Sequence, residues 1–187
     1  MSQGLTTTSY ALLGLLRFDD ATDSSGLTGY ELKQRADNTL RFYWVSPAMS
    51  QVYSELSRLT RQSYVEAVAD TGGGRTTHRY RITQAGRDAL QAWLATQQPE
   101  FPILKHPVAL RLLMGRLGGD KAMASMLQGY IDALAQRRTE LDAVRDRLGQ
   151  REAVRYAAMV ADWGLAYYDA ERDIVTELLG RLSSDAR

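Results

Sequence analysis

The chain has 187 residues, of which 44% are hydrophobic and 24% are charged, so it is long enough and apolar enough to bury a core. It has no cysteine, which excludes disulfides and thiolate metal sites and favours a reducing cytoplasm. Basic residues number 23 and acidic residues 22, so an affinity for a polyanion has to come from local charge rather than from net charge.

Three helices are predicted in the first third of the chain. The first covers 8–17; its short apolar run at 10–16 has no basic residue before it, so we interpret it as a buried helix and not as a signal peptide or a membrane span. Thr28 followed by Glu31 is a capping-box pattern and begins the second helix. In the third helix Ser46 can cap and Pro47 suits the first position. Its buried stripe is predicted to be Met49, Val52, Leu56 and Leu59.

A positively charged hairpin is predicted after the third helix. Two alternating runs, 64–70 and 78–82, bracket the glycine-rich stretch 71–77, which indicates two strands joined by a mobile tip. We expect Tyr80 and Ile82 to face the core and Arg79 and Arg81 to face outward. Residues 71–87 contain four arginines and one histidine but no acid. With a fourth helix over 83–95, this order predicts a winged helix-turn-helix DNA-binding domain at 1–98.

Four segments in register resemble the PadR-type transcriptional regulators: YALLGLL at 10–16, GYEL at 29–32, FYWVSPAMSQVYSELSRL at 42–59 and RYRITQAGRDALQAWL at 79–94. The resemblance implies an obligate dimer, a recognition helix in the major groove and a wing near the minor groove or phosphates. Carried over, the DNA-binding residues are Ser50, Gln51, Tyr53, Ser54 and Arg58 on the helix and Arg75, Thr77, His78 and Arg79 on the wing. Ser63 stands where the family usually has glycine, so the turn after the recognition helix must end the helix without a glycine.

The chemistry of single residues fits these roles without requiring them. Gln51 suits adenine, Arg58 suits guanine or phosphate, and Tyr53 can offer its hydroxyl to a phosphate, yet each is also compatible with ordinary helix surface. The glycine-rich stretch lacks the lysine and hydroxyl of a nucleotide-binding loop. His78 and His106 are far apart in sequence, so we predict no catalytic site, no metal and no cofactor.

The C-terminal half, 99–187, is predicted to be a helical dimerisation domain. Three prolines within 99–107 form a stiff joint, a short helix follows at 108–117, and long helices cover 120–149 and 152–182. A second apolar row on the last helix contains Trp163, Tyr167, Ile174 and Leu178. A helix pair with apolar residues on two sides needs a second subunit. The predicted dimerisation residues are Val154, Ala158, Ala161, Leu165, Tyr168, Val175 and Leu179.

The sequence therefore predicts a mostly α protein with a small β-hairpin wing and a C-terminal antiparallel helical domain. Its predicted function is that of a dimeric, cytoplasmic, sequence-specific DNA-binding transcriptional regulator that occupies a palindromic operator. The resemblance favours a repressor, released by a ligand or another signal, and leaves a small-molecule effector open. The expected partners are double-stranded DNA and a second copy of the chain, with no membrane. The alternative hypothesis is a winged-helix protein-interaction module; the outward arginines without acids favour DNA.

Overall fold

The structure is a computed structural model that describes residues 4–20, 25–70, 77–99, 101–102 and 105–185. The chain forms two compact units, residues 1–100 and 101–187.

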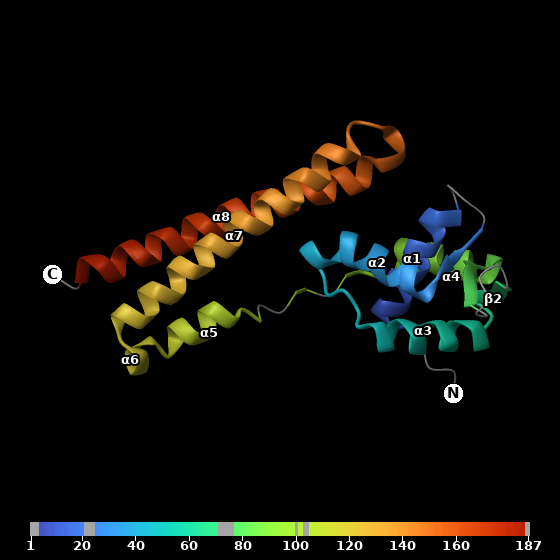
Figure 1. Ribbon diagram of the computed structural model, residues 1–187, viewed down its shortest axis with the longest axis horizontal. Helices are drawn as coiled ribbons and strands as arrows, with labels where there is room; N and C mark the ends of the chain where they lie inside the picture. Colours follow the sequence, from blue (N-terminus) through green and yellow to red (C-terminus); the bar gives the residue numbers. More distant parts are fainter. Residues whose placement is uncertain (1–3, 21–24, 71–76, 100, 103–104, 186–187) are drawn as a thin grey trace. The chain divides into compact units, whose positions relative to one another are not determined.

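The first unit is a winged helix-turn-helix. Its helices are α1 (Thr7–Asp20), α2 (Gly29–Thr39), the 3-10 turn η1 (Leu40–Phe42), α3 (Met49–Arg61) and α4 (Gln84–Thr96) (Figure 1). Its strands are β1 (Leu27–Thr28), β2 (Val65–Asp70) and β3 (Thr77–Ile82), antiparallel in the order β1-β3-β2. The predicted hairpin is thus extended by β1, whose Leu27 pairs with Tyr80. Two residues are too few to show an alternating pattern, so the sequence did not reveal β1.

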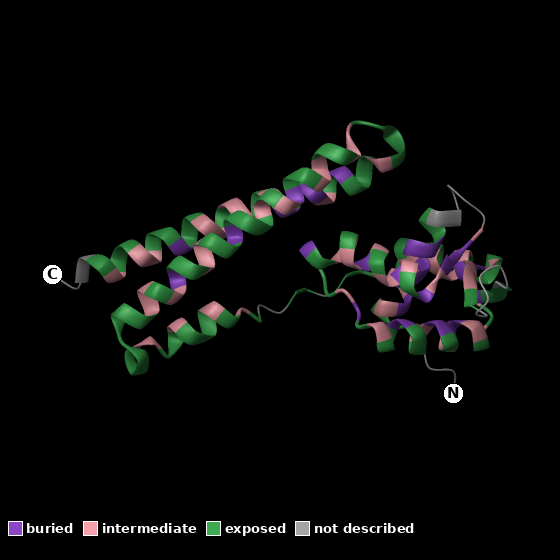
Figure 2. Cartoon of the chain, viewed as in Figure 1, coloured by how far each residue is buried: buried purple, intermediate pink, exposed green. Residues whose placement is uncertain are grey.

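The core of this unit is made by leucines of the three first helices and by the sheet. Ile82 is 3% exposed and Tyr80 packs against the same cluster, as predicted for the inward face of β3. Burial of each such side chain is worth roughly 1.5–3 kcal/mol. Figure 2 shows these buried positions gathered on the inner sides of the helices. The members at 0% exposure are Leu12, Leu13, Leu32, Ala36, Val52, Leu56 and Leu59.

The ends of α2 and α3 settle two expectations about capping. The Glu31 backbone N–H donates to Thr28 Oγ1 over 3.2 Å and the Thr28 N–H donates to Glu31 Oε2 over 2.8 Å, so the predicted capping box is confirmed. The predicted start of α3 at Ser46 and Pro47 is wrong, because α3 begins at Met49. The Ser46 hydroxyl donates to Asp37 Oδ1 over 2.6 Å instead and is not used as a cap.

The turn after α3 uses a left-handed residue that is not glycine. Ser63 has a φ of 61°. The Tyr64 N–H donates to the Leu59 carbonyl and the Ser63 N–H to the Thr60 carbonyl, both over 3.0 Å, which is the bonding pattern of a Schellman motif. Ser63 therefore ends the helix as a glycine would.

The second unit is dominated by a long helical pair. It contains α5 (Pro107–Leu113), α6 (Gly115–Gly118), α7 (Asp120–Leu148), the 3-10 turn η2 (Glu152–Val154) and α8 (Arg155–Asp185), and α7 runs along α8 (Figure 1). The short helix predicted at 108–117 is divided at Met114 into α5 and α6. Every seventh residue of α7 is buried at Leu127, Leu134 and Leu141. Among the described residues, no helix combines the length and the apolar character needed to cross a membrane.

Candidate nucleic-acid interface

The exposed side of α3 is polar and carries no unpaired acid. Val52, Leu56 and Leu59 bury the opposite side of this helix. Glu55, the one acidic residue of α3, is paired with Arg58 over 2.7 Å. At spacings of four, three and four residues, a single exposed stripe contains Ser50, Ser54, Ser57 and Arg61. Ser50 and Ser54 were predicted to lie here; Ser57 and Arg61 were missed, although the same helical spacing would have found them.

Gln51 lies at the edge of this stripe, in the first turn of α3, and is exposed. Its Oε1 accepts the Ala48 backbone N–H over 2.9 Å, so the side chain caps the start of the helix. Helix-turn-helix proteins direct this end of the recognition helix at base edges. A bidentate contact to adenine uses the oxygen together with the NH2 group, and the oxygen keeps a second lone pair beside its bond to Ala48.

Tyr53 is held against the start of α2 and is about half exposed. A Cβ placed on Gly29 would lie only 2.5 Å from the Tyr53 ring, so the ring can take this position only because residue 29 is glycine. Tyr30, in the first turn of α2, is 63% exposed. Two tyrosines therefore border the N-terminus of α2, the kind of helix end at which backbone N–H groups favour phosphate. Tyr30 was not predicted as a site residue, although it lies inside the GYEL segment.

Arg58 does not join the exposed stripe. Its side chain is 18% exposed and its Nη2 donates to Glu55 Oε2, while Nη1 donates to Gln62 Oε1 over 3.4 Å. The geometry thus disfavours the contact with guanine or phosphate that the sequence suggested. The reason is that the guanidinium is covered by its hydrogen-bond partners, which lie on α3 itself or just after it (Glu55 and Gln62) and on α1 (Ser9).

The wing residues differ in how they are placed. Thr77 and His78, the first residues of β3, are exposed, while Arg75 lies outside the described residues. Arg79 was expected to face outward, but its Nη1 donates to the Gly26 carbonyl over 2.6 Å and lies 3.5 Å from Glu31 Oε2. The Glu31 pKa is lowered below its ordinary value of 4.5, first by the bond from the Thr28 backbone and further by the charge of Arg79. Arg79 therefore ties β3 to the start of α2.

The predicted dimerisation stripe packs within the chain. Ala158, Ala161 and Val175 are almost fully buried, with Ala161 1% exposed, on the side of α8 that faces α7. Leu165, Tyr168 and Leu179 are half-buried and share this side, and Val154 is half-buried in η2, just before α8 begins. The opposite side of α8 exposes a row of large apolar side chains: Tyr156, Met159, Trp163, Tyr167 and Ile174. Within this single chain the predicted stripe thus packs α8 against α7, and the row of apolar side chains on the opposite side of α8 is exposed.

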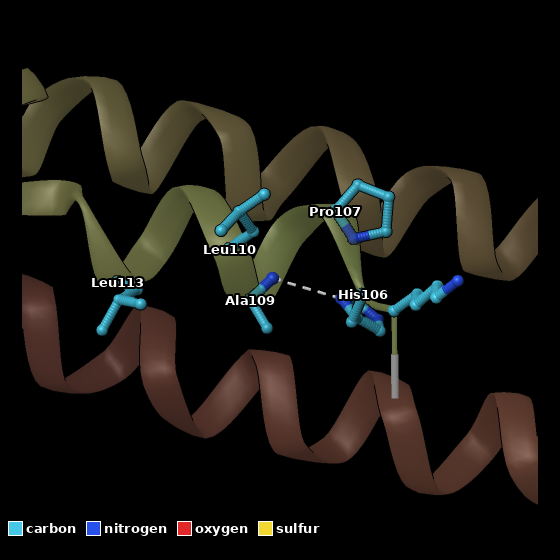
Figure 3. A pocket seen from close by; sticks show the side chains of 6 residues that line it. His106, Pro107, Ala109, Leu110 and Leu113 are labelled. Carbon is cyan, nitrogen blue, oxygen red and sulfur yellow. Dashed lines mark hydrogen bonds between the residues drawn. The ribbon is translucent and has the colours of Figure 1, made fainter. Parts of the chain in front are cut away.

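An open groove of about 650 Å³ runs along α5 (Figure 3). His106 is one of the residues that line this groove. Its Nδ1 accepts the Ala109 N–H over 3.1 Å, and its Nε2 lies 2.8 Å from Glu171 Oε1. Burial, with the nearby Glu171 charge, raises the pKa of Tyr130, whose hydroxyl lies 3.1 Å from His106 Nε2. The described residues hold no group of three or more His, Cys, Asp or Glu side chains that could bind a metal. The groove is lined by Lys105, His106, Pro107, Ala109, Leu110 and Leu113.

Comparison with known families identifies both units. Residues 21–92, which include α2, α3 and the sheet, match the Transcriptional regulator PadR-like family. The chain carries a PadR-like domain. The resemblance seen in the sequence is confirmed. Residues 104–183 match the family described as Virulence activator alpha C-term. No curated protein sequence matches the chain.

Several solved structures share the fold over nearly the whole chain. Bacillus subtilis PadR in complex with operator DNA is 20% identical and has a TM-score of 0.81, covering 95% of this chain and 99% of its own. The same protein in complex with p-coumaric acid gives 20% identity, a TM-score of 0.75 and the same coverage. The Vibrio cholerae virulence activator AphA is 20% identical, with a TM-score of 0.72 and coverage of 95% and 99%. At this identity the likeness establishes the fold.

Proposed function

We propose that this PadR-like chain is a dimeric transcriptional regulator that binds double-stranded DNA in a sequence-specific manner through α3. The observation that carries the proposal is the exposed face of α3, where Ser50, Ser54, Ser57 and Arg61 stand without an unpaired acid. Hydroxyl, amide and guanidinium groups are the groups that contact base edges and phosphates. A protein-docking module would place apolar side chains at the centre of such a face. The complex of Bacillus subtilis PadR with operator DNA supports the same function.

Within this proposal the polar residues divide into two roles. Gln51, Ser50 and Ser54, in the first two turns of α3, read base edges. Tyr53 and Tyr30 beside the N-terminus of α2 bind the phosphate backbone, together with Thr77, His78 and Arg75 of the wing. Arg58 and Arg79 are left out of both roles because their guanidinium groups are bound to Glu55 and to Gly26.

The dimer contact is assigned to the exposed row of α8, Tyr156, Met159, Trp163, Tyr167 and Ile174, in place of the stripe that packs on α7. Aromatic and methionine side chains in one contiguous row are typical of subunit interfaces. A two-fold axis through such a contact allows two copies of α3 to enter successive major grooves, about 34 Å apart, on a palindromic operator. The regulator then represses by occupying the operator.

A small molecule is the signal that we propose for release from the operator, and the groove along α5 is its binding site. The groove is apolar along Leu110 and Leu113 and has Lys105 at one end, which suits an apolar body with a carboxylate. The p-coumaric acid complex of Bacillus subtilis PadR makes that acid the first compound to titrate. Calorimetry should show that p-coumaric acid binds the full chain. Lys105→Gln should weaken this binding about tenfold or more, because a charged contact is lost. Equal binding by the variant contradicts this site.

Base reading by Gln51 is tested on an operator selected from random duplexes with the full chain. Gln51→Ala should cost roughly 1–3 kcal/mol on the operator and little on random DNA, because a base contact is lost and phosphate contacts remain. Gln91→Ala, an exposed glutamine on α4, is the matched control and should change neither affinity. Equal losses of Gln51→Ala on both duplexes would reassign Gln51 to the DNA backbone.

A further inference from the structure

Ser9 on α1 is the one fully buried polar side chain among the described residues, at 0% exposure. Part of its bonding closes the start of its own helix: the Thr6 N–H donates to Ser9 Oγ over 2.9 Å and the Ser9 N–H donates to Thr6 Oγ1 over 3.1 Å. This reciprocal pair caps α1. The same hydroxyl also reaches a second helix.

That second helix is α3. Ser9 Oγ donates to Glu55 Oε2 over 3.0 Å and accepts a hydrogen bond from Arg58 Nη2. Arg58 closes the triangle by donating to the same Glu55 oxygen from Nη2 over 2.7 Å and from Nε over 3.3 Å. A serine hydroxyl has one proton and two lone pairs. Glu55 receives the proton, and the lone pairs face Arg58, the Thr6 N–H and the Thr6 hydroxyl, whose Oγ1 lies 2.8 Å from Ser9 Oγ. No part of its hydrogen-bonding capacity is left unused.

We propose that Ser9, Glu55 and Arg58 are positioning residues that fix the rotation of α3 about its own axis, and so decide which side chains face the DNA. The proposal rests on the proposed function of α3. The other contacts of α3 with the core, through Val52, Leu56 and Leu59, are apolar and have no strong directional preference. Hydrogen bonds are directional and weaken steeply when their geometry is lost. The three residues are therefore the part of the α1–α3 contact that can hold a rotation.

The three residues sit where such control is most effective. Arg58 and Glu55 are each 18% exposed, so water competes little for their bonds and the charged pair is strengthened. Arg58 lies one residue after Ser57 and four residues after Ser54, both on the exposed stripe. A rotation that moved Arg58 away from Ser9 would turn that stripe by the same angle. Loss of the bonds should consequently reduce discrimination between sequences more than it reduces attraction to phosphate.

The test measures the affinity of the full chain for the selected operator and for a random duplex, over a series of salt concentrations, for Ser9→Ala, Arg58→Gln and the double variant. Each single change should reduce the operator-to-random ratio about tenfold, the effect of one lost charged hydrogen bond. The double variant should lose little more, because both changes break the same cluster. The salt dependence should stay as in the wild type, since Ser9 is buried and Arg58 contacts no phosphate. Glu55→Gln, which keeps the size of the side chain, should resemble the single variants.

Thr6→Ala is the matched control. It removes the Thr6 hydroxyl, and with it one half of the α1 cap and one contact of Ser9, but leaves the bonds of Ser9 to Glu55 and Arg58, so it should lower the melting temperature and preserve the operator-to-random ratio. A wild-type ratio in Ser9→Ala overturns the proposal, as does an Arg58→Gln variant whose salt slope falls by about one unit, which marks a direct phosphate contact. A ratio that falls equally in Thr6→Ala also overturns it, because helix stability alone would then explain the loss. If the wild-type chain binds no selected duplex more tightly than a random one, the proposed function itself is contradicted, and this inference falls with it.

Discussion

Ser63 holds a left-handed backbone conformation, with a φ of 61°, at the end of the helix proposed to bind DNA. For a residue with a Cβ this conformation costs roughly 1–2 kcal/mol, and glycine avoids the cost. The hydrogen bonds that close the turn use backbone atoms, and the Ser63 carbonyl also accepts from Thr83 Oγ1 over 2.7 Å. A glycine at position 63 keeps all of them.

Ser63→Gly should therefore raise the free energy of unfolding by about 1 kcal/mol, part of the gain being offset by the greater entropy of glycine in the unfolded chain. Urea denaturation followed by circular dichroism measures the difference. Ser57→Gly, at an exposed position inside the same helix, is the control and should lower stability by roughly 0.5 kcal/mol. A Ser63→Gly protein no more stable than the wild type would mean that the turn is not strained.

The sequence was informative about single residues wherever the spacing along one helix decides the outcome. The apolar stripe of α3 placed Val52, Leu56 and Leu59 in the core and left Ser50 and Ser54 exposed, as predicted, while Met49, the fourth predicted member, is half-buried in the first turn. Arg58 could not be placed in this way, because Ser9, the residue that turns it inward, lies 49 positions away in the chain. Contacts between distant segments have no periodic signature.

At the scale of elements, α8 shows why a periodic pattern does not by itself identify the partner of each apolar side. Both sides of α8 are apolar, so its sequence predicts two contacts but not which of them is made within the chain. The structure pairs Ala158, Ala161 and Val175 with α7, where the leucines at every seventh residue face them. Two ion pairs, Arg138–Asp169 at 2.8 Å and Arg145–Asp162 at 2.5 Å, also bridge the two helices. The row on the opposite side stays exposed, and it is the row proposed above as the dimer contact.

Two substitutions separate the two contacts of the helical pair. Trp163 is 75% exposed, so Trp163→Asp should leave the fold intact but force an unpaired carboxylate into the proposed dimer interface and produce monomers. Leu134→Ala should instead lower the stability of the chain by about 2–5 kcal/mol, because it leaves a cavity between α7 and α8, without exposing new charge to the partner. Analytical ultracentrifugation measures the mass of the particle in solution, and thermal unfolding measures the stability of the chain. A dimeric Trp163→Asp protein would show that the row is not the interface.

At the scale of the whole molecule, the two units have separate roles in the proposed mechanism. The winged unit encloses its own core and presents α3, and the helical unit supplies the two-fold contact that lets two copies of α3 act on one operator. Joining two half-site contacts raises their combined affinity far above that of either one, because the second contact forms at a high effective concentration. The monomeric Trp163→Asp protein should accordingly bind a palindrome hardly better than a half-site.

The central claim is that the acid-free face of α3 gives this chain sequence-specific affinity for duplex DNA. The most direct test is one pair of titrations of the full chain at a single near-physiological salt concentration, one with the best duplex selected from a random pool and one with an unselected duplex. We predict that the selected duplex binds at least about 10³-fold more tightly, the lower end of the range for specific DNA-binding proteins. A selection that enriches no sequence, or two equal affinities, would contradict the account.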